Sequence, residues 1–183
     1  VRPESITFTS GGTESNNLAI VGVVEQIHKS GLPYSEMEVV TTEIEHPSVM
    51  KVMKELESRG VVVKYVSVDR EGFVQLSDLK ENLSAKTVLF SVAYANSEIG
   101  VVQKLHALKK VLTEVEKKYE SKILFHLDAA QAPLWLACQF DALNADLVSL
   151  DVGKCNGPKG VGVLVKGRRV TLAPTVFGGG QES

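Results

Sequence analysis

Apolar residues follow two different periods along this chain. Short β-branched runs alternate with longer stretches in which apolar residues recur at steps of three or four. The first period is typical of strands and the second of amphipathic helices. Strands are therefore predicted at residues 6–9, 37–42, 61–68, 87–93, 123–127, 146–150 and 161–165. Helices are predicted at residues 14–29, from Pro47 onwards, across Leu79 and Leu83, and at 105–118.

The alternation of strand and helix predicts one α/β domain over residues 1–183. Strands joined through helices run parallel, so we expect three layers, a mostly parallel sheet with helices on both faces. The run at 161–165 is expected to turn back, because it follows a tight turn at residues 157–160. Ligands of such sheets bind beyond the carboxyl ends of the strands, where several polar residues of this chain lie.

The composition and net charge of the chain exclude some classes of binding partner. The chain has 183 residues, of which 44% are hydrophobic and 23% charged, and its formal net charge is −2. The scattered charges offer no basic surface to nucleic acid or an anionic membrane, and the apolar runs are too short to span a bilayer. No signal peptide is visible, and the two cysteines make neither a disulfide framework nor a CxxC metal pair. We therefore predict a cytoplasmic protein with no nucleic-acid or membrane partner and no bound metal.

Gly11, Gly12 and Thr13 lie between the first predicted strand and its helix. Glycines let the backbone approach a ligand closely, and the free N–H groups at a helix start attract anions. Thr13 adds a hydroxyl donor, so the segment predicts a phosphate cradle, although it has neither a Walker lysine nor a GxGxxG spacing. The alternative is a glycine turn in which Thr13 caps the helix.

Three more polar residues follow predicted strands. His46 would either cap the helix that starts at Pro47 or place its imidazole over a flat ligand. Asp128, at a buried strand end, needs a cationic partner such as a protonated ring nitrogen, unless it caps a helix with Gln131 as its capping-box partner. Lys154, near apolar strand ends, would be either a partly desolvated nucleophile or a solvated loop lysine.

These segments, with a few others, resemble the class V aminotransferase family, and most closely its cysteine desulfurase branch. They run in the family's order along nearly the whole chain, and they are specific as a set although no single one is decisive. The matching stretches are residues 8–17, Glu45-His46-Pro47, residues 95–100, residues 126–131, Lys154 with residues 157–160, and residues 178–182. The resemblance implies the large domain of a fold-type-I enzyme that uses pyridoxal 5'-phosphate (PLP).

The resemblance also implies catalytic roles. Lys154 would hold the cofactor aldehyde as a Schiff base and later move protons. Asp128 would pair with the pyridinium nitrogen and preserve the ring as an electron sink. His46 would stack on the face of the ring.

Other implied residues bind the cofactor. Asn96 and Gln131 would hydrogen-bond the phenolic oxygen of the ring, and Gly12 and Thr13 would hold the phosphate. The implied reaction removes sulfur from L-cysteine, which leaves alanine and a persulfide on an enzyme cysteine. The sulfur then passes to an acceptor protein for iron–sulfur clusters or thiolated cofactors, and members of the family are usually homodimers.

Two residues depart from the family's pattern Ser-x-His-Lys, in which the serine and histidine bind phosphate. Here the run reads Asp151-Val152-Gly153-Lys154. A carboxylate at position 151 should repel the phosphate dianion unless it turns away or is protonated, and Gly153 offers no side chain. We therefore expect weaker cofactor binding than is usual in the family, with Thr13 and backbone N–H groups carrying the phosphate.

The family's persulfide cysteine and its substrate-binding arginine belong to a later, smaller domain, and a further segment precedes the core. We expect both parts to be absent from residues 1–183, which would expose apolar surface and can leave the fragment itself inactive. Cys138 and Cys155 are expected to be packed residues and not nucleophiles.

Other functions stay open at the level of sequence. Selenocysteine lyase shares the chemistry, and residues 178–182 suit it too, whereas a transaminase fits residues 96–100 less well. Asp151 and Gly153 favour a degenerate, non-catalytic binding subunit, and the retention of Lys154 with its partners argues against one. A Rossmann-type nucleotide binder would need a GxGxxG after the first strand.

Overall fold

Within residues 2–178, which the computed structural model of the chain describes, seven strands form a single sheet. The strands are β1 (Ile6–Thr9), β2 (Glu38–Thr42), β3 (Val62–Val66), β4 (Thr87–Ala93), β5 (Leu124–Asp128), β6 (Leu147–Asp151) and β7 (Gly162–Lys166). Their order across the sheet is β1-β7-β6-β5-β4-β2-β3. The matching stretch at 178–182 lies, after its first residue, outside the described residues.

The sheet is mostly parallel, as predicted. β2 pairs in parallel with β3 and β4, and parallel pairing continues from β4 to β5 and from β5 to β6. β7 turns back to pair antiparallel with β6, and β1 pairs antiparallel with β7. β1 therefore points the same way as β6, so its last residue, Thr9, lies at the edge where the parallel strands end.

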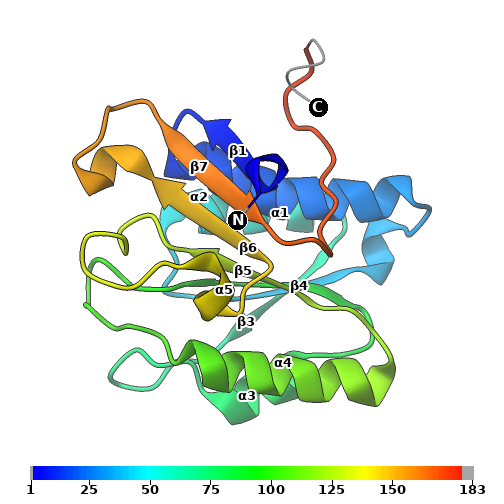
Figure 1. Ribbon diagram of the computed structural model, residues 1–183. Helices are drawn as coiled ribbons and strands as arrows, with labels where there is room; N and C mark the ends of the chain where they lie inside the picture. The colour runs from blue at the N-terminus through cyan, green and yellow to red at the C-terminus, as the bar shows by residue number, and fades with distance from the viewer. Residues whose placement is uncertain (1, 179–183) are drawn as a thin grey trace.

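Helices cover both faces of the sheet, which confirms the predicted three-layer α/β fold (Figure 1). One face carries α1 (Gly12–Lys29) and α2 (Pro47–Ser58), and the other carries α3 (Leu76–Asn82) and α4 (Leu105–Tyr119). The shorter elements are α5 (Phe140–Leu143) and the 3-10 turns η1 (Pro3–Ser5), η2 (Tyr34–Glu36) and η3 (Val152–Cys155). Across the described part of the chain, no helix combines the length and apolar character needed to cross a bilayer.

The core lies on both sides of the central strands. On one side the rings of Phe90 and Phe125 stack with their centroids 5.6 Å apart, in the same apolar cluster as Leu112 of α4. On the other side Ile20 of α1 and Met53 of α2 belong to one cluster. Burial on both faces explains why the strand sequences are almost continuously apolar, because neither face meets water.

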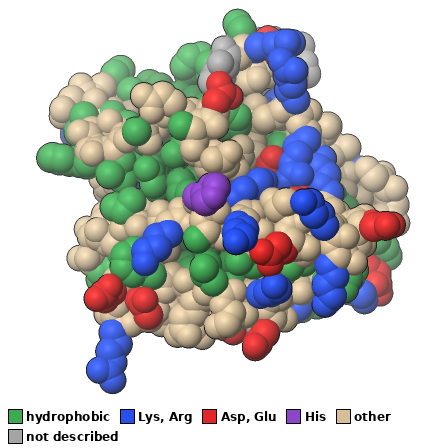
Figure 2. All heavy atoms as spheres, turned by 60° about the horizontal axis from the view of Figure 1, so that its bottom comes forward, with side chains coloured by type: hydrophobic (Ala, Val, Ile, Leu, Met, Phe, Trp, Pro, Cys, Tyr) green, Lys and Arg blue, Asp and Glu red, His purple; other side chains and the backbone are tan. Residues whose placement is uncertain are grey.

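On the face that Figure 2 shows, charged and apolar side chains gather in different places. Figure 2, in which the lower face of Figure 1 comes forward, shows lysines and arginines mixed with acids over the side of α3 and α4. Apolar side chains gather at its left, the side on which the loops at the strand ends lie in Figure 1. Ile99, Leu134 and Trp135 of these loops are exposed, Trp135 to 81%.

Two element boundaries differ from the prediction in a way that matters for ligand binding. α1 begins at Gly12 and not at residue 14, so the glycine segment supplies the first turn of the helix. β5 ends on Asp128 and not on Leu127, so the carboxylate is held by the sheet itself. Both residues lie at the same edge of the sheet.

Candidate functional site

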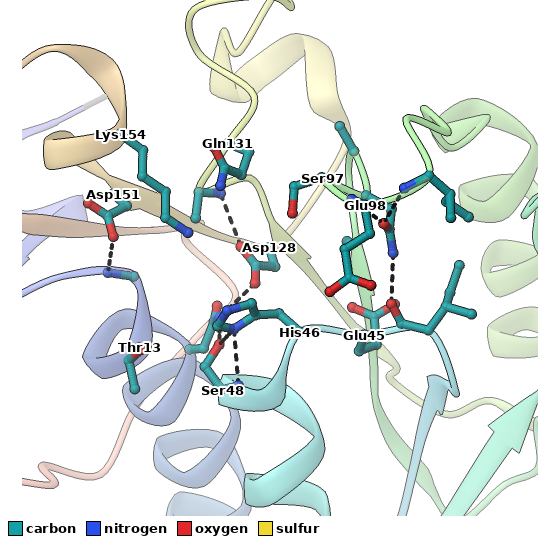
Figure 3. A pocket seen from close by; sticks show the side chains of 18 of the residues that line it. Thr13, Glu45, His46, Ser48, Ser97, Glu98, Asp128, Gln131, Asp151 and Lys154 are labelled. Carbon is teal, nitrogen blue, oxygen red and sulfur yellow. Dashed lines mark hydrogen bonds between the residues drawn. The ribbon is translucent and has the colours of Figure 1, made fainter.

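A cavity of about 340 Å³ opens at the carboxyl ends of the parallel strands (Figure 3). Every residue that the sequence predicted for the site lines this cavity: Gly12, Thr13, His46, Asn96, Asp128, Gln131 and Lys154. They come from the start of α1, the loop before α2, the loop after β4, the end of β5 with the turn beyond it, and η3. The fold thus brings together segments that are far apart in the sequence.

Asp128 is only 8% exposed, and both of its carboxylate oxygens accept hydrogen bonds. Oδ1 accepts from the backbone N–H of Ala130 at 3.0 Å, and Oδ2 accepts from Nδ2 of Asn16 at 2.7 Å. A turn and not a helix follows Asp128, and no capping-box bond to Gln131 is present among the described residues. The sheet therefore holds the carboxylate against the cavity with one hydrogen bond on each oxygen, and the helix-cap alternative does not apply.

Asp128 is connected to His46 through two residues that had no predicted role. Nδ2 of Asn16 also donates to Oγ of Ser48 at 2.9 Å, and this hydroxyl lies 2.8 Å from Nδ1 of His46. The backbone N–H of Ser48 donates to the same Nδ1 at 3.1 Å, as a helix cap of α2. Nδ1 is therefore an acceptor, and the neutral ring carries its hydrogen on Nε2. His46 thus caps the helix and also faces the cavity.

Asn16 could have been recognised from its place in α1. It lies on the buried face of the helix with Ala19, Ile20 and Val23, and its side chain is only 1% exposed. A polar residue in an apolar stripe costs free energy unless it is hydrogen-bonded, so its position signals a structural or functional partner. Oδ1 of Asn16 has no partner among the described residues.

Glu45 is a second buried carboxyl group in the cavity wall. Thr42 Oγ1 donates to Oε1 at 2.6 Å, and Oε2 has no partner among the described residues. Burial raises the pKa of Glu45 to about 8; the Thr42 hydrogen bond opposes this rise and the negative charge of Asp128 adds to it. The carboxyl group is therefore mostly protonated, and neutral, at pH 7. In the motif Glu45-His46-Pro47, the sequence had assigned a role only to His46.

The side-chain amides of Asn96 and Gln131 differ in the number of hydrogen bonds that they make within the protein. Nδ2 of Asn96 donates to the carbonyl of Ile44 at 2.8 Å, and Oδ1 accepts from the N–H groups of Glu98 and Ile99. Asn96 therefore ties the loop after β4 to the loop before α2 and keeps one amide hydrogen for a ligand. The Gln131 side chain makes no hydrogen bond to the described residues and lines the cavity.

Lys154 follows β6 in η3, and Figure 3 shows its amine end directed into the space between Asp151 and Asp128. The side chain is exposed and forms no ion pair with the described residues. The exposure agrees with the alternative of a solvated loop lysine and not with a partly desolvated one. Its position facing the cavity agrees with the predicted site.

Asp151 does not turn away from the predicted phosphate cradle. Its Oδ2 accepts a hydrogen bond of 3.3 Å from the backbone N–H of Gly12, at the first turn of α1. The carboxylate therefore lies where an anion would meet the helix start. Gly153 adds no side chain to the wall.

The two cysteines are free and partly buried. The Cys155 thiol donates to the carbonyl of Asp151 at 3.2 Å, and Cys138 packs against the core. Burial raises the pKa of both thiols, with smaller contributions from the charge of Asp151 on Cys155 and of Cys155 on Cys138. Less thiolate means lower reactivity, which supports the prediction that both are packed residues.

His126, two residues before Asp128, is fully buried between two serines. Its Nδ1 lies 2.8 Å from Oγ of Ser91, and its Nε2 lies 2.9 Å from Oγ of Ser149. Burial lowers the pKa of His126 to about 4, against a smaller opposing effect of Asp128. The imidazole is therefore neutral at pH 7 and links three neighbouring strands of the sheet.

Comparison with known proteins agrees with the architecture of the site. The aminotransferase class-V family matches residues 1–183. A mitosomal cysteine desulfurase of Trachipleistophora hominis is 43% identical over 181 residues, which are 98% of this chain and 39% of that protein. Two solved structures align with all of this chain: a NifS-like protein, at 36% identity and a TM-score of 0.89, and SspA in complex with cysteine, at 34% identity and a TM-score of 0.86.

The chain spans only part of these relatives, 48% of the NifS-like protein and 50% of SspA. The resemblance to cysteine desulfurases that the sequence motifs predicted is confirmed over the whole chain. Because the family match extends from the first residue to the last and the fold agrees with it, the chain belongs to the aminotransferase class-V family.

Proposed function

We propose that this chain is the cofactor-binding part of a PLP-dependent cysteine desulfurase. The observation that carries the proposal is the convergence of Lys154, Asp128 and His46 on one cavity at the carboxyl ends of the strands. Relatives named cysteine desulfurases support it. We also propose that residues 1–183 form the large domain of the family and that its other segments lie outside these residues.

The ring end of the cavity fits the chemistry of the cofactor. Asp128 is buried, and each of its oxygens accepts one hydrogen bond, from Asn16 and from Ala130. Each oxygen therefore keeps a lone pair with which it could accept from a protonated pyridine nitrogen, whose charge would offset that of the buried carboxylate. Oδ1 of Asn16 and Oε2 of Glu45 are buried, have no partner among the described residues and belong to residues that line the cavity, so both can hydrogen-bond a polar group bound there. The phosphate end fits less well, because Asp151 lies at the start of α1.

When bound, PLP supplies an electron sink that withdraws electrons from the substrate Cα. Asp128 would hold the proton on the ring nitrogen, and Lys154 would bind the aldehyde carbon and later move a proton at the substrate. The bonds to Nδ1 fix the ring of His46 at the cavity wall, where it would stack on the face of the cofactor ring. Asn96 and Gln131 would donate to the phenolic oxygen, and Gly12 and Thr13 would contact the phosphate.

The proposed substrate is L-cysteine. Its C–S bond breaks, and the sulfur atom enters the S–H bond of an enzyme cysteine, which gives L-alanine and a persulfide without an external oxidant or reductant. We infer that the accepting cysteine lies outside this chain and that an acceptor protein for iron–sulfur clusters or thiolated cofactors takes the sulfur. The proposed protein is a homodimer, and the cytoplasmic location is proposed from the two free thiols.

The first test uses the purified chain with added PLP. We expect a visible absorption band that borohydride removes, and peptide mapping should locate the fixed cofactor on Lys154. Lys154→Ala should abolish the labelling, whereas Lys159→Ala, an exposed lysine of the following turn, should leave it unchanged. Labelling that is absent, or spread over surface lysines, would contradict the cofactor site.

One observation favours a second candidate, a non-catalytic relative that serves as a binding subunit. Asp151 already accepts the hydrogen bond from the Gly12 N–H that a phosphate would be expected to use. The same experiment separates the two functions, because a non-catalytic chain gives no band at saturating PLP. If no band forms, the Asp151 variants described below show whether this carboxylate is what prevents PLP from binding.

A further inference from the structure

The start of α1 contains an anion-binding arrangement that is already occupied from within the chain. Gly12 donates its N–H to Oδ2 of Asp151 across 139 residues of sequence. A Cβ at Gly12 would lie 3.3 Å from Asp151 Cβ, so the carboxylate packs directly against the glycine backbone. The free N–H groups and the positive end of the helix dipole thus face a carboxylate of the protein.

The second oxygen of Asp151 occupies the other side of the same corner. An added Cβ at Gly153 would lie 3.3 Å from Oδ1 of Asp151, so this oxygen fills the space beside residue 153. Asp151 therefore reaches both backbone segments that border the cradle. The one cationic side chain that these segments contribute to the cavity wall is Lys154, which the proposed function assigns to the cofactor aldehyde and not to the phosphate.

The rest of the wall strengthens the negative potential of the cavity. Lys154 is the only lysine or arginine among the lining residues, and the lining carboxyl side chains are Glu43, Glu45, Glu98, Asp128 and Asp151. Glu45 is neutral at pH 7, but the others still exceed the single cation. A dianion that enters this cavity meets like charge from several directions.

We propose that the carboxylate of Asp151 takes the place of the cofactor phosphate at the start of α1 and so sets the specificity of the site. Compared with a site whose helix start is free to bind phosphate, this site should favour pyridoxal, which has no phosphate, over PLP. This inference rests on the proposed function. A phosphate must displace the carboxylate from Gly12 or stay beside it, and both cost binding free energy. Pyridoxal has the same ring and aldehyde but no dianion, so its contacts with Asp128 and Lys154 avoid this cost.

The test measures the affinities of PLP and pyridoxal separately for the purified full chain. Binding is followed by the visible band and by quenching of the single tryptophan, Trp135. Asp151→Asn keeps an acceptor at the helix start and removes the charge, and Asp151→Ser shortens the side chain as well. Asp141→Asn is the matched control, because it removes one exposed carboxylate that has no hydrogen bond or ion pair among the described residues.

Both Asp151 variants should bind PLP at least about tenfold more tightly, which corresponds to about 1.4 kcal/mol, while pyridoxal affinity changes less than about threefold. Asp141→Asn should leave both affinities unchanged. An equal PLP-to-pyridoxal ratio in the wild-type chain and both variants would overturn the proposal. If Asp151 only caps α1, the variants lose thermal stability at a constant ratio, which overturns it equally.

Failure of the proposed function has a different signature. In that case borohydride fixes neither aldehyde on Lys154 in the wild-type chain or in either Asp151 variant, and both ideas fall together. If both aldehydes label Lys154 in every protein at an unchanged ratio, the cofactor site stands and only the role of Asp151 is wrong.

Discussion

Two buried carboxyl groups share the cavity but meet different partners. Asp128 has an N–H donor for each oxygen, one from Asn16 and one from Ala130. Glu45 accepts from the hydroxyl of Thr42 on Oε1, and Oε2 has no partner among the described residues. Burial therefore raises the pKa of Glu45 to about 8, so at pH 7 this carboxyl group is mostly protonated while it lies near the carboxylate of Asp128.

Replacement of Glu45 by glutamine should remove a pH dependence of stability. Unfolding returns the carboxyl from a pKa of about 8 to its ordinary value of 4.5, so its contribution is complete below pH 4.5 and is lost as the pH rises through 8. Each tenfold change in proton affinity is about 1.4 kcal/mol, so the loss amounts to a few kcal/mol. Glu45→Gln should match the wild type near pH 4.5 and be more stable above pH 8 in urea unfolding.

The exposed neighbour Glu43 provides the control, because Glu43→Gln removes a charge without removing a buried acid. His126 acts in the opposite direction: burial lowers its pKa from 6.5 to about 4, so its contribution is complete above pH 6.5 and is lost as the pH falls through 4. The wild type, Glu45→Gln and Glu43→Gln all retain His126, so this loss cancels when the free energies of unfolding of the variants are compared with that of the wild type. Stability profiles of Glu45→Gln and the wild type that run parallel from pH 4.5 to 9 would refute the prediction.

The sequence identified those site residues that stand out against their local pattern. Asp128 at the end of an apolar strand and Lys154 beside a glycine turn are such residues, and both line the cavity. Ser48 and Glu45 could not be found in this way, because their importance comes from contacts with residues that are distant in sequence. The hydrogen bond from Asn16 to Ser48 joins two helices, and no local period encodes it.

At the scale of elements, the cradle depends on how closely β7 approaches the start of α1. Gly162 pairs with Thr9 across β1 and β7. A Cβ at Gly162 would lie 2.5 Å from the carbonyl carbon of Gly11 and 2.5 Å from Thr9 Oγ1. Since backbone atoms cannot rotate away as a side chain can, this position requires glycine for close packing and not for an unusual dihedral angle.

Gly162→Ala should therefore destabilise the chain and displace the first turn of α1. Overpacking of a rigid site costs roughly 1–3 kcal/mol, measured as the free energy of unfolding in urea. Gly167→Ala is the control, because the nearest atom to its added Cβ is 3.4 Å away, an ordinary contact. Equal stability of the two variants would show that β7 can shift without cost.

The sequence predicted the long elements and a mostly parallel sheet, but it predicted neither the order of the strands across the sheet nor the short elements between them. The antiparallel return of β7 followed from the turn at 157–160, and the structure confirms it. α5 and η3 were not predicted, because elements of four residues have too few positions to display a period. η3 matters most, since it sets the direction of Lys154, and only the packing of the finished sheet determines it.

At the scale of the molecule, exposed apolar side chains occur at several places, among them Phe8 of β1 and Phe177 of the C-terminal segment, and one group lies at the edge that carries the site. Trp135 is 81% exposed and follows the strand of Asp128 by a few residues. Figure 2 shows apolar side chains gathered on that side. Exposed apolar surface beside a cavity is typical of a site that a partner completes, which supports the proposed homodimer.

The emission of Trp135, the only tryptophan, should therefore report on association of two copies. As the protein concentration rises, its emission should shift to shorter wavelength, because a second copy removes the indole from water. Sedimentation should show twice the chain mass over the same range.

Trp135→Asp should raise the dimer dissociation constant at least about tenfold, since it places a charge in a desolvated interface. Phe177→Ser, at an aromatic residue of equal exposure in the C-terminal segment, should leave it unchanged. A chain that stays monomeric at every concentration, or a Trp135→Asp variant that associates like the wild type, would rule this surface out, and the exposed aromatic would then belong to a contact with another part of the protein.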